Sequence, residues 1–109
     1  MIEVTIERKQ SAIKSFTVTG HAGSGPYGHD LVCAAVSAVS FGAVNAVLQL
    51  CEIDLSIDQA GDEGGFLKIA LPDDNEDEKA SILLEGMVVS LQTIERDYGQ
   101  FISITDAMK

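Results

Sequence analysis

The stretch from Leu31 to Cys51 contains no charged residue, and this feature constrains the fold more than any other in the chain. Its length meets the criterion for a membrane-spanning helix, which needs about 20 predominantly apolar residues. Several of its positions are polar or small, however, and no Lys or Arg stands between Lys14 and Lys68 to orient a span. We therefore expect a long, buried helix, whose small side chains let a sheet or a second helix approach closely.

The composition of the whole chain indicates one soluble domain, covering residues 1–109. Hydrophobic residues make up 46% and charged residues 22%, which is typical of globular proteins. The 17 acidic and 7 basic side chains give a formal net charge of -10, which repels phosphate backbones and anionic lipid headgroups. We expect no direct nucleic-acid partner and no membrane partner, while an acidic surface suits a basic polypeptide.

The amino terminus and the cysteines predict a cytoplasmic location. Residues 1–7 carry acids where a signal peptide needs basic residues followed by an unbroken apolar run. Cys33 and Cys51 lie on the same predicted helix and are about 27 Å apart at about 1.5 Å of rise per residue, so they cannot bridge each other. Unpaired thiols indicate a reducing compartment.

Alternating apolar and polar residues predict strands on both sides of the uncharged helix. A glycine-rich loop over residues 20–28 leads into that helix, and a second helix has an apolar stripe from Ala80 to Ile94 and is ended by Gly99. The predicted strands cover residues 2–7, 12–19, 53–58, 66–71 and 101–105.

The resulting element order is ββαββαβ. Two helices of this kind most simply cover one face of a mixed, mostly antiparallel sheet. The sequence therefore predicts a two-layer α+β fold, in which the first helix is long and buried.

Cys33 is the strongest candidate for chemistry. If Asp30 is the helix N-cap, Cys33 occupies the third helical position, where unpaired N–H groups and the positive end of the helix dipole lower a thiol pKa. The same N–H groups can stabilise the oxyanion of a tetrahedral intermediate. The alternative is an inert core residue among apolar neighbours.

Two histidines compete as the general base for that thiol. His21 follows the end of a predicted strand, which holds its backbone beside the helix start, and His29 lies four residues before Cys33. The spacing does not separate them. A site built from both histidines with Asp30 and Cys33 matches no standard zinc spacing, so we expect no metal.

The loop segment Gly23–Gly28, GSGPYG, is formally a dinucleotide-binding GxGxxG motif. That motif requires the helix to begin within it, whereas Pro26 and Asp30 place the helix start after it. We interpret the loop as a segment that covers the substrate. The alternative function is a non-catalytic nucleotide- or ribosome-associated binding module, with Cys33 in the core. The loop glycines are Gly20, Gly23, Gly25 and Gly28.

The blocks GHA at residues 20–22 and GHDLVCAAVS at residues 28–37 resemble the signature of the ribosomal-processing cysteine protease family, Prp. The resemblance covers the length and element order of essentially the whole chain. It implies that Cys33 and His21 form a catalytic dyad and that His29 occupies a variable position. Asp30 and Ser37 also match the motif, and we interpret Asp30 as the helix cap and Ser37 as a polar support beneath the thiol.

Members of this family remove a short N-terminal extension from a large-subunit ribosomal protein, cutting after Phe, and tend to form dimers. The resemblance therefore implies a cysteine endopeptidase that needs no cofactor, acts on the N-terminal peptide of a basic ribosomal protein and forms a homodimer. The implied reaction is acyl transfer, in which His21 takes the proton of Cys33 and later protonates the leaving amine.

Overall fold

The computed structural model describes residues 1–26, 30–60 and 65–107 and has the predicted element order. The sheet order is β3-β4-β2-β1-β5, with β1 and β5 parallel and the other pairs antiparallel, so the mixed, mostly antiparallel α+β fold is confirmed. The elements are β1 (Ile2–Lys9), β2 (Ala12–Thr19), α1 (Leu31–Leu50), β3 (Ser56–Gln59), β4 (Phe66–Ala70), α2 (Glu78–Tyr98) and β5 (Ile102–Ala107).

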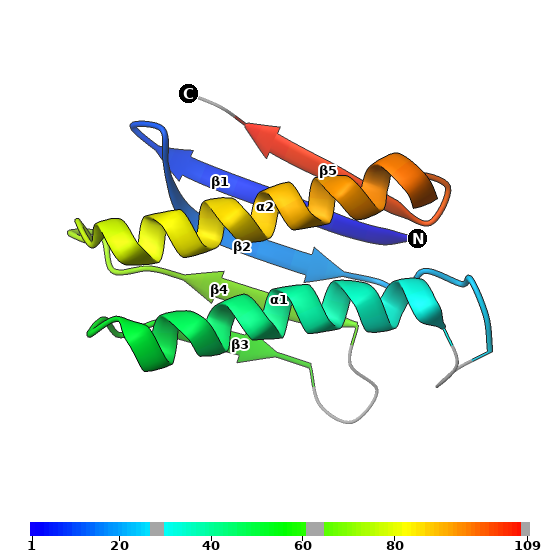
Figure 1. Cartoon of the computed structure of the whole chain (residues 1–109), viewed down its shortest axis with the longest axis horizontal. Coiled ribbons are helices and arrows are strands. Elements are labelled where there is room, and N and C mark those ends of the chain that lie inside the picture. The colour runs from blue at the N-terminus through cyan, green and yellow to red at the C-terminus, as the bar shows by residue number, and fades with distance from the viewer. Residues whose placement is uncertain (27–29, 61–64, 108–109) are drawn as a thin grey trace.

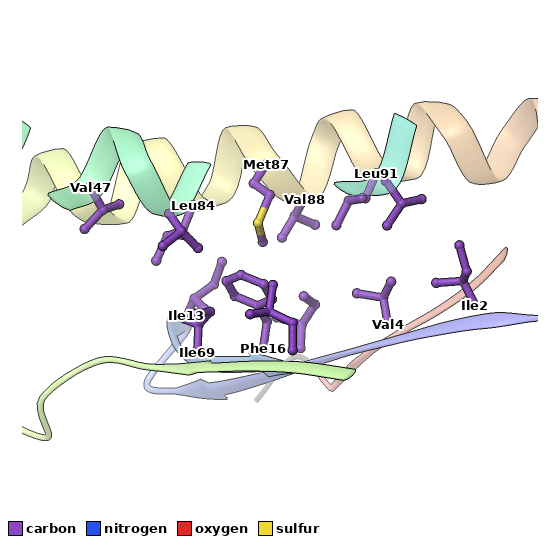
Figure 2. Packing of buried hydrophobic residues seen from close by; sticks show 14 of the residues in the cluster. Ile2, Val4, Ile13, Phe16, Val47, Ile69, Leu84, Met87, Val88 and Leu91 are labelled. Atoms are coloured by element: carbon purple, nitrogen blue, oxygen red, sulfur yellow. The ribbon is translucent and has the colours of Figure 1, made fainter. Parts of the chain in front are cut away.

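Both helices lie on the same face of the sheet, and the core fills the space between the two layers (Figures 1 and 2). The alternation seen in the sequence explains this arrangement, because every second residue of β1 points towards the helices. Phe16 and Ile69 from the sheet face Leu84 and Leu91 from α2, and all four are fully buried. Truncating one such side chain to Ala typically costs about 2–5 kcal/mol of stability.

A buried arginine ties α2 to the parallel pair of strands. The Arg8 side chain is only 5% exposed, and its guanidinium donates to Glu85 at 2.6 and 3.0 Å and to Asp106 at 2.8 and 2.9 Å. The hydrogen bonds to Asp106 and Glu85 raise the pKa of Arg8 further above its ordinary value. This network joins β1, α2 and β5 at the end of the sheet where β1 and β2 are connected.

Helix α1 is as long as predicted, but it is not buried all round. One stripe is buried, whereas Phe41 and Leu48 on the other side are 41% and 46% exposed. A two-layer fold explains the difference, because it gives each helix only one side to bury. Among the described helices, α1 alone is long and apolar enough to cross a membrane, and its buried stripe belongs to the core shared with α2 and the sheet.

Strand β3 is shorter than predicted. It begins at Ser56, and Ile53 and Leu55 pack against the core before the strand starts. All four residues of β3 are exposed, because it is an edge strand that pairs with β4 alone. The alternation around Ile57 therefore reflects an edge strand rather than a half-buried one.

Ser40 is a polar side chain on the buried stripe of α1, and it generates a prediction about stability. Its side chain is fully buried, and its hydroxyl has no hydrogen-bond partner among the described residues. Removing an unsatisfied buried hydroxyl relieves a desolvation penalty, so Ser40→Ala should raise the free energy of unfolding by about 1 kcal/mol. Urea denaturation measures this, with Val44→Ala on the same stripe as the control that should lower it. A destabilised Ser40→Ala chain would contradict the prediction.

Candidate active site

The candidate site lies where the end of β2, the start of β4 and the amino end of α1 meet. Thr19 pairs with Phe66, and one residue further on the Gly20 N–H donates to the Gly65 carbonyl at 2.8 Å. Gly20 has a φ of 87°, and a Cβ there would lie 2.3 Å from the carbonyl oxygen of Met1. Only glycine fits this close approach, which directs the chain from the sheet towards α1.

Asp30 caps α1 as predicted. Its carboxylate accepts the Cys33 N–H at 3.0 Å, so the helix starts at Leu31 and Cys33 is its third residue. The same carboxylate accepts the Ser24 N–H at 3.0 Å and the Ser24 hydroxyl. These bonds, from Cys33 first and Ser24 second, hold the pKa of Asp30 well below its usual range. Asp30 thereby connects the loop after β2 to the helix.

The sulfur of Cys33 contacts the same loop. Its Sγ accepts the N–H of Ala22 at 3.1 Å, and Ala22 is a buried residue directly after His21. Cys33 itself is half-buried at the edge of the core. The fold therefore brings together the two sequence blocks that contain the histidine and the cysteine. Cys51 is buried at the other end of α1.

The thiol is less acidic than the sequence predicted. Burial raises the pKa of Cys33 above its ordinary value, and the nearby Asp30 carboxylate raises it too, while the Ala22 N–H acts in the opposite direction. The expected effect of the helix start is offset because the capping carboxylate binds the Cys33 N–H and brings its own negative charge.

The N–H groups at the start of α1, which were predicted to stabilise an oxyanion, already have hydrogen-bond partners. The Cys33 N–H binds the Asp30 carboxylate, the Ala34 N–H binds the Asp30 carbonyl at 3.0 Å, and the Val32 N–H points to the Ser24 hydroxyl at 3.4 Å. The donor that points at the sulfur is the backbone N–H of Ala22. Sequence analysis did not assign this N–H, although Ala22 belongs to the GHA block.

His21 lies at the turn after β2 and is exposed. Its Nε2 would be 2.9 Å from a Cβ added at Gly65, so the imidazole lies against the backbone that enters β4. Gly65 is a part of the site that sequence analysis missed. A glycine before a strand is a common turn signal, and nothing in the local pattern connects it with a histidine far away in the sequence.

The structure describes some, but not all, of the remaining predicted residues. Ser37 is exposed on α1, and the described hydrogen bonds of Cys33 run to Asp30 and Ala22, so the role of Ser37 as a polar support beneath the thiol stays a prediction. Gly23 has a φ of 72° with open space around it, and Gly25 is half-buried. Gly28 and His29 lie outside the described residues.

Among the described ranges, no group of three or more His, Cys, Asp or Glu side chains is arranged to hold a metal ion. The described site has a thiol that accepts the N–H of Ala22, in a loop that also contains His21, and a thiol is suited to nucleophilic attack on a carbonyl group.

Comparison with known proteins agrees with this chemistry. The family model for cysteine protease Prp matches residues 1–103. The chain is 47% identical over 109 residues to the ribosomal processing cysteine protease Prp of Bacillus subtilis, covering 96% of both chains. It is 41% identical over 105 residues to the protein of that name from Staphylococcus aureus, covering 94% of both.

Solved structures of the S. aureus ribosomal processing protease Prp have the same fold. One, in complex with a covalently linked product peptide, superposes with a TM-score of 0.90 at 42% identity, covering 97% of this chain and 99% of that chain. Another, with a substrate peptide, gives a TM-score of 0.83 at 39% identity over the same shares. The match over nearly the full length, together with a cysteine and a histidine block at one corner, shows that this chain belongs to the cysteine protease Prp family.

Proposed function

We propose that this chain removes a short N-terminal extension from a large-subunit ribosomal protein, cutting after an aromatic residue, with Cys33 as the nucleophile and His21 as the general base. One observation carries the proposal: the Cys33 sulfur accepts the N–H of Ala22, the residue that follows His21. The relatives are named as ribosomal processing proteases, and one of them was solved with a covalently linked product peptide. A covalent peptide is what a nucleophilic thiol produces.

The proposed reaction is acyl transfer in two steps. His21 takes the proton of the Cys33 thiol as the sulfur attacks the scissile carbonyl carbon, and the C–N bond breaks as His21 gives that proton to the leaving amine. Water, deprotonated by the same imidazole, then attacks the thioester and releases the acid and the thiol. The Ala22 N–H is placed to stabilise negative charge that develops beside the sulfur.

The raised thiol pKa makes the base indispensable in this mechanism. A raised pKa lowers the fraction of thiolate at neutral pH, and the protonated thiol is the weaker nucleophile. Proton removal must therefore accompany attack, which is general-base catalysis rather than attack by a resting thiolate.

The charge of the chain supports a basic substrate. A formal net charge of -10 favours encounter with a positively charged ribosomal protein. The uncharged outer side of α1, which exposes Phe41 and Leu48, is compatible with a homodimer, because two such faces meet without charge repulsion. The homodimer and the cytoplasmic location stay predictions.

The alternative of a nucleotide-binding module receives no support. Helix α1 starts at Leu31, after the glycine-rich segment rather than within it, which removes the structural context of a dinucleotide fingerprint. Membership of a cysteine protease family further favours catalysis.

Cys33→Ala should abolish cleavage of the extended ribosomal protein while the chain remains folded, because it removes the attacking atom from a half-buried position. Gel analysis of the cleavage product measures activity, and circular dichroism checks the fold. Cys51→Ala is the matched control, since it deletes the other thiol, and its rate should stay within a few-fold of the parent. Retained cleavage by Cys33→Ala would contradict the nucleophile assignment.

His21→Ala should lower the cleavage rate by about a hundredfold or more, the usual range for loss of a general acid–base group. His29→Ala is the control and should keep the parent rate. Single-turnover cleavage with a peptide that spans the Phe site compares the two variants. If they exchange phenotypes, the base is His29 and not His21.

Asp30→Asn should lower the pKa of the Cys33 thiol, because Asn still caps the helix but removes the carboxylate charge that destabilises the thiolate. Iodoacetamide labelling as a function of pH, in a Cys51→Ala chain that has a single thiol, measures that pKa. In the parent chain the midpoint should lie above the ordinary thiol value. In the Asp30→Asn variant the midpoint should fall, and labelling at pH 7 should become several-fold faster. A labelling midpoint of the parent chain below the ordinary thiol pKa would contradict the raised pKa of Cys33.

A further inference from the structure

Gly65 lies opposite Gly20, where the loop after β2 begins. It lies directly before β4 with a φ of 80°, and its carbonyl accepts the Gly20 N–H at 2.8 Å. This bond extends the contact between β2 and β4 by one residue beyond the Thr19–Phe66 pair. The position of Gly65 is therefore fixed relative to the residue that precedes His21.

The imidazole of His21 occupies the space where a side chain at residue 65 would begin. A Cβ at Gly65 would lie 2.9 Å from Nε2, 3.5 Å from Cε1 and 3.6 Å from Cδ2 of His21, and these are its three nearest atoms. A contact below 3.0 Å is not tolerated, so a side chain at residue 65 requires the ring to move. The approach is closest at Nε2, at the far end of the ring from the His21 Cβ.

We propose that Gly65 is a positioning residue for the reaction: its lack of a side chain creates the space in which the His21 imidazole is held, and its carbonyl fixes the loop that carries the histidine. This inference rests on the proposed function of His21 as the base. It makes the residue directly before β4 part of the active site, although Gly65 is remote in sequence from both motif blocks.

The contact predicts that a side chain at residue 65 lowers the cleavage rate strongly while the chain still folds. The crowded atom belongs to the end of a side chain, so the ring moves aside while the backbone keeps its path. A displaced base fails to align with the thiol proton, and misplacement by about 1 Å costs up to about a hundredfold in rate. Gly65→Ala should thus lower kcat/KM by about tenfold or more in a chain that still folds.

Two substitutions distinguish crowding of the imidazole from backbone strain as the cause of a lower cleavage rate. Ala and Asn both add a Cβ, but Asn tolerates a positive φ much better than Ala. If crowding of the imidazole is the cause, Gly65→Ala and Gly65→Asn lose rate alike. If strain is the cause, Gly65→Asn is close to the parent, and the proposal is wrong. Gly23→Ala provides the stability reference, because Gly23 has a φ of 72° but nothing near its Cβ.

A double-mutant cycle tests whether Gly65 acts through His21. Kinetics are measured on the same peptide for the parent, Gly65→Ala, His21→Ala and the double variant. The proposal requires that Gly65→Ala costs tenfold or more in the parent and less than twofold in the His21→Ala chain. Equal losses in both chains would show that Gly65 acts elsewhere and would overturn it.

Proton NMR of the histidine ring gives a readout that does not depend on catalysis. The chain has two histidines, so the His21 Hε1 resonance is assigned by its loss in His21→Ala. Gly65→Ala and Gly65→Asn should both shift this resonance, and an unchanged resonance would overturn the proposal. If His21→Ala keeps the parent rate, the base assignment in the proposed function fails, and the resonance alone then decides whether Gly65 places the ring.

Discussion

The carboxylate of Asp30 is the interaction on which the geometry of the site depends, because it binds the loop and the helix at the same time. One oxygen accepts the Cys33 N–H, and the two oxygens also accept the hydroxyl and the N–H of Ser24. A helix start can fray by a residue or two, and fraying of α1 would unwind the first turn, which contains Cys33. The cap fixes the start at Leu31 and so fixes the direction of Cys33.

The same carboxylate determines the chemistry of the thiol. It occupies the helix N–H that would otherwise stabilise the thiolate, and its charge disfavours a second negative charge nearby. Both effects act against ionisation of the thiol, in the direction opposite to the one expected at a helix start.

Features encoded within a few neighbouring residues could be predicted from the sequence. The alternation of β1 and β2, the N-cap at Asp30 and the third-residue position of Cys33 all depend on such short-range patterns, and they are confirmed. Features that depend on a distant part of the fold could not be predicted. The exposure of residues on α1 depends on which side of the helix faces α2 and the sheet, and the thiol pKa depends on the burial of Cys33.

Glycines show most clearly why the rest of the site could not be predicted. Gly23 and Gly65 have nearly the same positive φ, so the local chain imposes the same requirement on both. Only the folded structure distinguishes them, since open space surrounds one and the His21 imidazole covers the other. A turn signal in the sequence reports the path of the backbone and contains no information about the side chain that rests on it. The contact between Gly65 and His21 exists because β4 pairs with β2, a pairing between strands that are separated in sequence by all of α1 and β3.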